Sequence, residues 1–193
     1  NYDSEYFSDR NLSYFSYLSS FINFEKINNI FDYGAGNGNL GYLINKKFKR
    51  TEVIAGVATG AIGIGMMVAQ QLNKPFIYIR SSKKQHGRKN SIEGGFIKGQ
   101  KVIVIEDLIS TGMSSIKACN SVIENQLELL GLVSIFTYGF NEAVNNFKNE
   151  KIINYSLSSY DYLIKEAVNM KKIDEKEINM LFSWKEDPKK WKF

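Results

Sequence analysis

The segment that most constrains this chain lies near its middle, where an apolar run leads into two carboxylates and a turn of small residues. Residues 102–105 are all β-branched, Glu106 and Asp107 follow them directly, and Ser110-Thr111-Gly112 precede a stretch with helical spacing. A short apolar run bounded in this way is typical of a buried strand, and the turn after it of a helix N-terminus. The segment therefore predicts a strand-turn-helix unit with acidic side chains at the carboxyl end of the strand.

The same alternation of short apolar runs and helical periods continues from Val53 onward. It predicts βαβ units and hence an α/β fold, with a central, mainly parallel sheet flanked by helices. No linker composition or repeat divides the 193 residues, so we expect one domain at residues 51–193, preceded by an atypical segment at residues 1–50. The expected strands are 53–57, 76–79, 102–105, 131–137 and 152–157, and the expected helices are 61–72, 114–125, 141–147, 160–168 and 175–184.

Residues 81–100 interrupt this pattern. They are polar, basic and glycine-containing, with too little apolar content for a helix or a central strand. Loops of roughly this length inside a compact domain are usually functional or disordered. The segment also contains His86, the only histidine of the chain, without an apolar face that would bury it. We therefore expect a functional loop here.

The residues that follow strand 102–105 have the chemistry to bind a phosphorylated sugar. Glu106 and Asp107 can accept hydrogen bonds from vicinal hydroxyls at the strand end where open α/β sheets bind ligands. The turn after them offers hydroxyls and unpaired backbone N–H groups at a helix N-terminus, where an anion is favoured. A plainer interpretation is that these residues only cap a helix. Two acids fused to an apolar strand and followed at once by this turn favour a ribose 5-phosphate site.

Composition narrows the class of protein further. A single cysteine, Cys119, excludes an intramolecular disulfide and a multi-cysteine zinc site. The net charge of +5 suits a nucleic acid or an anionic small substrate. The basic residues of 81–100 lack the interleaved aromatic side chains that stack on bases, which favours the small substrate and indicates no nucleic-acid partner. No apolar run approaches the roughly 18 residues of a membrane span, so we expect a cytoplasmic protein with no membrane partner.

Segment 102–115 is similar to the phosphoribosyl-pyrophosphate (PRPP) signature of type I phosphoribosyltransferases, and it resembles orotate phosphoribosyltransferases most closely. The resemblance extends over residues 52–191 and includes 53–61, which is similar to the family's first strand and pyrophosphate loop. It implies the type I phosphoribosyltransferase fold. In this family Ser110 would also contact orotate. The residues that the resemblance assigns to PRPP are Thr59, Gly60, Arg80, Lys84, His86, Glu106, Asp107, Leu108, Ile109, Ser110, Thr111, Gly112, Met113 and Ser114.

Residues 78–87, followed by 92–94, resemble the family's mobile catalytic loop. Arg80, Lys84 and His86 fall on the positions that contact the pyrophosphate in that family, and the catalytic set that the resemblance implies is Lys84, His86 and Asp107. The family carries this loop across a dimer interface. The resemblance therefore implies a homodimer in which residues 81–98 reach the neighbouring site.

The reaction implied by the resemblance is transfer of ribose 5-phosphate from PRPP to N1 of orotate. The products are orotidine 5′-monophosphate and diphosphate, in the pyrimidine (UMP) biosynthesis pathway. Mg²⁺ is the implied cofactor, bound mainly through PRPP, with no ligand directly from the protein. Catalysis would depend on stabilising the negative charge that develops on the leaving diphosphate.

Residues 1–50 depart from this family. Orotate phosphoribosyltransferases carry there an aromatic, Ser/Gly, Lys/Arg and Ser-Pro-x-Tyr segment that covers the base, and nothing similar precedes Thr51. Instead, residues 29–39 resemble the first glycine motif of S-adenosylmethionine methyltransferases, a weak pattern because no acidic residue ends the next strand. Three alternatives therefore stay open: a phosphoribosyltransferase for another base, an inactive PRPP-binding module, and a methyltransferase.

Overall fold

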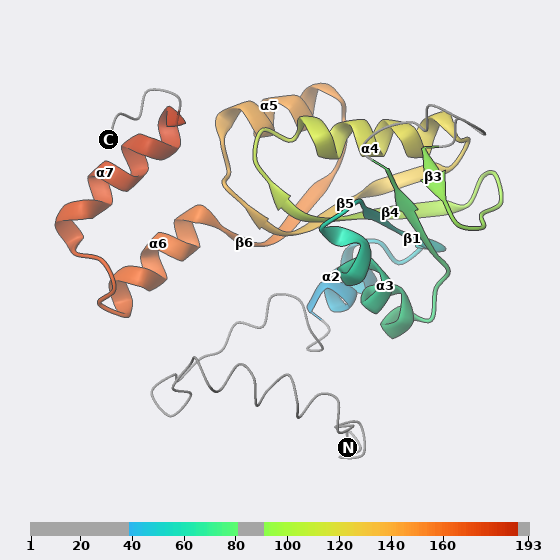
Figure 1. The fold of residues 1–193 in the computed structure, drawn as a ribbon, viewed down its shortest axis with the longest axis horizontal. Coiled ribbons are helices and arrows are strands. Elements are labelled where there is room, and N and C mark those ends of the chain that lie inside the picture. Colours follow the sequence, from blue (N-terminus) through green and yellow to red (C-terminus); the bar gives the residue numbers. More distant parts are fainter. Residues whose placement is uncertain (1–38, 81–90, 189–193) are drawn as a thin grey trace, which may run out of the picture. The chain divides into compact units, whose positions relative to one another are not determined.

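The computed structural model describes residues 39–80 and 91–188 (Figure 1). Its elements are α2 (Asn39–Lys47), β1 (Val53–Val57), α3 (Ala61–Leu72), β2 (Phe76–Ile79), β3 (Ile92–Glu93), β4 (Lys101–Ile109), α4 (Met113–Glu124), β5 (Glu128–Thr137), α5 (Asn141–Asn149), β6 (Asn154–Ser159), α6 (Tyr160–Asn169) and α7 (Glu175–Glu186).

The strands form one six-stranded sheet in the order β3-β2-β1-β4-β5-β6. All neighbouring pairs are parallel except β2 and β3, which pair in antiparallel orientation. The predicted α/β fold with a mainly parallel sheet is therefore confirmed. The two-residue edge strand β3 lies inside the stretch for which the sequence predicts only a loop, and its antiparallel pairing at the sheet edge needs few apolar residues.

Helices cover both faces of the sheet. In Figure 1, α4 and α5 lie above the strands, while α2 and α3 lie below them. Helix α3 packs on β1, β2 and β4, and α4 packs on β4 and β5. Because both faces are covered, the central strands are apolar on both sides, as is usual for parallel sheets. The whole of β1 is buried, as are residues 102–106 of β4.

Strand β4 is longer than its apolar run predicts. It continues to Ile109 because β5 remains paired with it, through Leu108 with Phe136 and Ile109 with Thr137. Glu106 and Asp107 are therefore residues of the strand itself rather than of the turn after it. Strand side chains alternate between the two faces of a sheet, so these neighbouring carboxylates face in different directions.

Helix α2 was not predicted from the sequence, although its residues pack in the core. Leu40 and Ile44 are buried at four-residue spacing, which places them on one face of the helix, and Phe48, directly after the last helical residue, is buried as well. The ring of Phe48 lies against Gly131 of β5, where a β-carbon would approach the ring to 2.9 Å. Part of segment 1–50 thus contributes to the core of the sheet domain.

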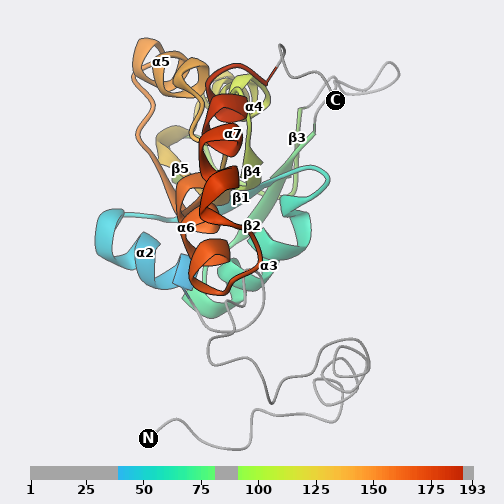
Figure 2. The same ribbon diagram turned by 90° about the vertical axis from the view of Figure 1, so that its left-hand side faces the viewer.

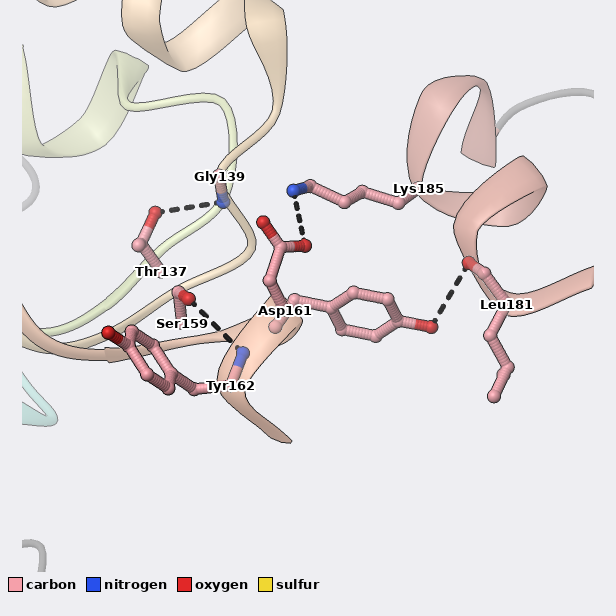
Figure 3. Close-up of polar contacts among 8 residues, drawn as sticks. Thr137, Gly139, Ser159, Asp161, Tyr162, Leu181 and Lys185 are labelled. Carbon is pink, nitrogen blue, oxygen red and sulfur yellow. Dashed lines mark hydrogen bonds and ion pairs between the residues drawn. The ribbon is translucent and has the colours of Figure 1, made fainter. Parts of the chain in front are cut away.

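The C-terminal helices follow the edge strand β6 and are seen face-on in Figure 2. Helix α6 begins after Ser159, whose hydroxyl accepts from the Tyr162 N–H, and α7 begins with a capping box formed by Asp174 and Glu177 (Figure 3 shows the first contact). Among the helices that the structure describes, none is long and apolar enough to cross a membrane.

Candidate functional site

Two carboxylates lie near the carboxyl end of β4, and their surroundings differ. Glu106 is only 5% exposed, and its carboxylate accepts hydrogen bonds from the Ser115 hydroxyl at 3.0 Å and from the Asp107 N–H at 3.2 Å. Burial, with the neighbouring Asp107 carboxylate, raises the pKa of Glu106 to about 7. Glu106 therefore takes part in the packing between β4 and α4. Its predicted contact with a ribose hydroxyl stays a prediction.

Asp107 is exposed and lies against the turn that follows β1. One of its carboxylate oxygens accepts from the Leu108 N–H at 2.8 Å. A β-carbon added at Gly60 would collide with the other oxygen, so glycine is the residue that permits this approach. The peptide bond between Ala58 and Thr59, at the start of the same turn, is cis. The fold thus brings the predicted residues Thr59, Gly60 and Asp107 together.

The turn between β4 and α4 is shaped by Gly112, which precedes the helix with a φ of 79°. This left-handed conformation favours glycine. Ser110, Met113 and Ser114 are exposed around it, and Thr111 is partly buried. The first N–H groups of an α-helix have no partner within the helix, so the N-terminus of α4 can bind an anion from the solvent side.

The remaining predicted residues of β4 and β2 contribute in different ways. Leu108 is 39% exposed, whereas Ile109 is 2% exposed and its carbonyl accepts from the Tyr138 N–H at 3.0 Å. The side chain of Ile109 therefore belongs to the core. Arg80 follows β2 and forms an ion pair with Glu93 of β3 at 3.1 Å. Its side chain is one-third exposed, and because β2 and β4 both run parallel to β1, it follows a strand at the same sheet edge as Asp107.

Lys84 and His86, the other two predicted catalytic residues, lie outside the described residues. The same holds for residues 29–38 of the methyltransferase-like motif, and for most of segment 1–50, which is expected to replace the family's base-covering region. The roles of these residues stay predictions.

Three residues of this site were missed in the sequence analysis: Ser115, Asn146 and Phe147. Ser115 is the third residue of α4, and its helical position could have indicated an inward-facing hydroxyl. Asn146 and Phe147 come from α5, and Asn146 donates a hydrogen bond to the Thr111 carbonyl at 3.0 Å. Nothing in the sequence links them to a turn about thirty-five positions earlier, because that contact depends on how α5 packs beside α4.

Cys119 lies in α4, one turn after Ser115, and is fully buried. Burial, reinforced by the nearby charge of Glu106, raises the pKa of its thiol to about 12. The thiolate, which is the reactive form, is therefore strongly disfavoured at neutral pH. Cys119 is a packing residue of the helix that the site uses.

Comparison with known proteins places this geometry in context. Residues 26–155 match the family model described as the phosphoribosyl transferase domain. An orotate phosphoribosyltransferase from Cytophaga hutchinsonii is 47% identical over 150 residues, which cover 78% of this chain and 72% of that protein. One from Staphylococcus aureus is 44% identical over 154 residues, covering 80% and 76%.

Solved structures give the same picture of the fold. The crystal structure of orotate phosphoribosyltransferase from Aeropyrum pernix superposes with a TM-score of 0.58 at 25% identity, covering 64% of this chain and 68% of that one. The family model begins at residue 26, well before residue 52, where the resemblance noted in the sequence begins. The match therefore includes the glycine-rich stretch at 29–39.

Proposed function

Because this chain belongs to the orotate phosphoribosyltransferase family, we propose that the Thr59–Gly60 turn, Asp107 and residues 108–114 form its PRPP site. The protein is a pentosyltransferase that transfers ribose 5-phosphate from PRPP to orotate, giving orotidine 5′-monophosphate and diphosphate in pyrimidine biosynthesis. The observation that carries the site assignment is the exposed carboxylate of Asp107, which lies against Gly60 and shares a sheet edge with the open N-terminus of α4.

Within this site each group has a distinct task. Asp107 accepts hydrogen bonds from the ribose hydroxyls, and its negative charge makes those bonds stronger than neutral ones. The N–H groups and hydroxyls of Ser110, Thr111 and Ser114 bind the 5′-phosphate at the start of α4. The turn at Thr59 and Gly60 lets backbone groups approach the diphosphate closely. Ser110 also contacts orotate.

Bond breaking would place positive charge on the anomeric carbon and negative charge on the leaving diphosphate. Arg80, Lys84 and His86 would stabilise the second charge. In the structure Arg80 is paired with Glu93. Arg80 could contact the diphosphate while it keeps one guanidinium edge on Glu93, because a guanidinium presents several N–H donors in a rigid plane.

Mg²⁺ fits this site as a partner of the substrate. Among the described residues no group of three or more His, Cys, Asp or Glu side chains could hold a metal ion. In the proposed reaction the ion would take most of its oxygen ligands from PRPP, beside the carboxylate of Asp107. When bound it would neutralise part of the diphosphate charge.

The test is loss of orotate absorbance in the presence of PRPP and Mg²⁺. Asp107→Asn should reduce kcat/KM for PRPP by about a hundredfold, since it removes a charged acceptor for the ribose hydroxyls. Glu150→Gln, an exposed acid at the end of α5, is the matched control and should leave kinetics unchanged. Unchanged kinetics in Asp107→Asn would contradict the assignment of the ribose site to the end of β4. Uracil and purines tested in place of orotate distinguish an orotate phosphoribosyltransferase from one that uses another base.

The functional unit that we propose is a homodimer in which residues 81–98 reach the neighbouring site. Lys84→Ala and Asp107→Asn chains would each have at most a few per cent of wild-type activity alone, roughly the effect of a hundredfold loss. If the loop acts across the interface, a mixed dimer contains one site with both residues intact, so an equal mixture should regain about a quarter of wild-type activity. Absence of any recovery after confirmed subunit exchange would mean that the loop serves its own subunit.

A further inference from the structure

The turn before α4 has a support outside the strand and turn residues assigned above. It comes from α5, where two adjacent residues contact two adjacent residues of the turn. The Asn146 amide donates to the Thr111 carbonyl at 3.0 Å. The Phe147 ring, 2% exposed, lies so close to Gly112 that a β-carbon there would approach it to 2.8 Å. Helix α5 also packs beside α4.

The Asn146 contact determines the direction of a neighbouring N–H. The Thr111 carbonyl and the Gly112 N–H belong to one peptide group, and the only cis bond among the described residues is the one between Ala58 and Thr59. In a trans peptide group the C=O and the N–H point in opposite directions. Because the Thr111 carbonyl points to α5, the Gly112 N–H points away from α5.

Phe147 restricts position 112 to glycine. Gly112 has a φ of 79°, and the buried ring beside it leaves no room for a side chain. A rotation of the peptide group would turn the Thr111 carbonyl away from its donor and towards the phosphate side of the turn. A carbonyl oxygen would then face an anion, in place of an N–H group.

We propose that Asn146 is a positioning residue for phosphate binding: it holds the peptide group between Thr111 and Gly112 so that the Gly112 N–H is available to the 5′-phosphate of a phosphorylated ribose. The inference rests on the proposed function of residues 110–114 as the phosphate site. It adds to that site a residue from a different helix, which touches no substrate and acts through the turn.

The experiment measures binding of ribose 5-phosphate by calorimetry, and steady-state kinetics, for three variants. Asn146→Ala removes the donor, and Asn146→Asp keeps the size of the side chain while replacing the donor with a negative acceptor. Asn145→Ala is the matched control, because Asn145 is its exposed neighbour on α5. We expect both Asn146 variants to weaken ribose 5-phosphate binding and to raise KM for PRPP by about tenfold, the effect of losing one aligned hydrogen bond. KM for orotate at saturating PRPP, kcat and the control should change little.

Equal binding and equal KM for PRPP in wild type and Asn146→Asp would overturn the inference, as would a fall in kcat with unchanged KM. A variant that fails to fold is replaced by the other, and failure of both to fold, with Asn145→Ala folded, would assign Asn146 to stability and overturn the positioning role. Failure of the proposed function has a different signature, since wild type itself would then bind no ribose 5-phosphate.

Discussion

The carboxyl end of β4 and the C-terminal helices α6 and α7 are held in place by different means. Strand β4 has a paired neighbour on each side, helices on both faces, and core residues such as Val104 and Ile105 with no exposed surface. Helix α7 has no buried side chain among those described. A few contacts attach it instead. One is a cluster of Tyr138, Phe140, Tyr160 and Trp184. Another is the ion pair between Lys185 and Asp161, which Figure 3 shows.

The two regions therefore have different roles: the end of β4 carries the candidate site, and the aromatic cluster attaches the C-terminal helices. The candidate site depends on close approaches of backbone and short side chains, which the sheet fixes. The C-terminal helices depend on large side chains that bury area. A hydrogen bond joins the two regions, since the Tyr138 N–H donates to the Ile109 carbonyl just before the turn. We therefore expect substitutions at the site to change kinetics at nearly constant stability, and substitutions in the aromatic cluster to do the reverse.

Among the substitutions that compare these two regions, the largest kinetic effect should come from Gly60→Ala. The added β-carbon would displace the Asp107 carboxylate and obstruct the close approach of the diphosphate, so kcat/KM should fall by about a hundredfold, the effect of a misplacement of roughly 1 Å. Gly63→Ala is the control, because nothing lies within 4 Å of a β-carbon there. Steady-state kinetics with PRPP measure the effect on activity, and thermal unfolding measures the effect on stability. A Gly60→Ala enzyme of wild-type activity would show that the turn does not approach the substrate.

The complementary change in the C-terminal region is Trp184→Ala. Its indole contacts three rings, with centroid distances of 5.6, 5.8 and 5.1 Å to Tyr138, Phe140 and Tyr160. Removing it should lower the free energy of unfolding by about 3 kcal/mol, measured by urea denaturation. Activity at 25 °C should stay within about threefold of wild type. A loss of activity comparable to that of Gly60→Ala would mean that the two regions are not separable.

A smaller effect on stability should come from Glu106 and depend on pH. Its pKa is about 7 in the folded protein and near the ordinary value of 4.5 in the unfolded chain. The unfolded chain therefore releases this proton first as pH rises, so the contribution to stability is complete below about pH 4.5 and is lost by about pH 7.

Comparing wild type with Glu106→Gln by urea denaturation across this range should show a difference in pH dependence of about 3 kcal/mol. Asp107→Asn should move the window to lower pH, because the Asp107 carboxylate is one cause of the raised pKa of Glu106. Parallel pH profiles for wild type and Glu106→Gln would contradict the buried placement of this carboxyl group.

The smallest effect should be that of the ion pair in the C-terminal region. The Lys185 ammonium lies 2.6 Å from Asp161, whose side chain is 54% exposed. An ion pair open to solvent on one side contributes only about 0.5 kcal/mol and weakens with salt. A double-mutant cycle of Lys185→Ala and Asp161→Ala, measured in low and high salt, gives the coupling energy. A value above roughly 2 kcal/mol would place the pair among the main attachments of α7.

Local patterns predicted some elements residue by residue. Strands β1 and β2 and helix α3 have the predicted bounds, since β-branched runs and helical spacing are properties of neighbouring residues. Strand β4 runs beyond its apolar residues because β5 pairs with it, and α2 is stabilised by contacts such as Phe48 with Gly131, more than eighty positions away. These contacts are set by the tertiary fold.

The candidate site shows the same division. Asp107, the glycine turn and the N-terminus of α4 follow from sequence order, because the carboxyl ends of parallel strands share an edge of the sheet. The inward orientation of Glu106 depends on Ser115 and on the covering helix. The support from Asn146 depends on the packing of α5. The residues that would contact the substrate could be predicted from the sequence, whereas the residues that hold them in place could not.

The burial of Cys119 gives this protein a built-in kinetic probe. Since the chain has one cysteine, and it lies fully buried in α4, a thiol reagent can modify it only after α4 separates from the sheet. The labelling rate, compared with that of a free thiol, reports the free energy of that local opening. PRPP bound at the N-terminus of α4 should slow the labelling. The rate of Cys119 modification would therefore report how much of the site is occupied by PRPP.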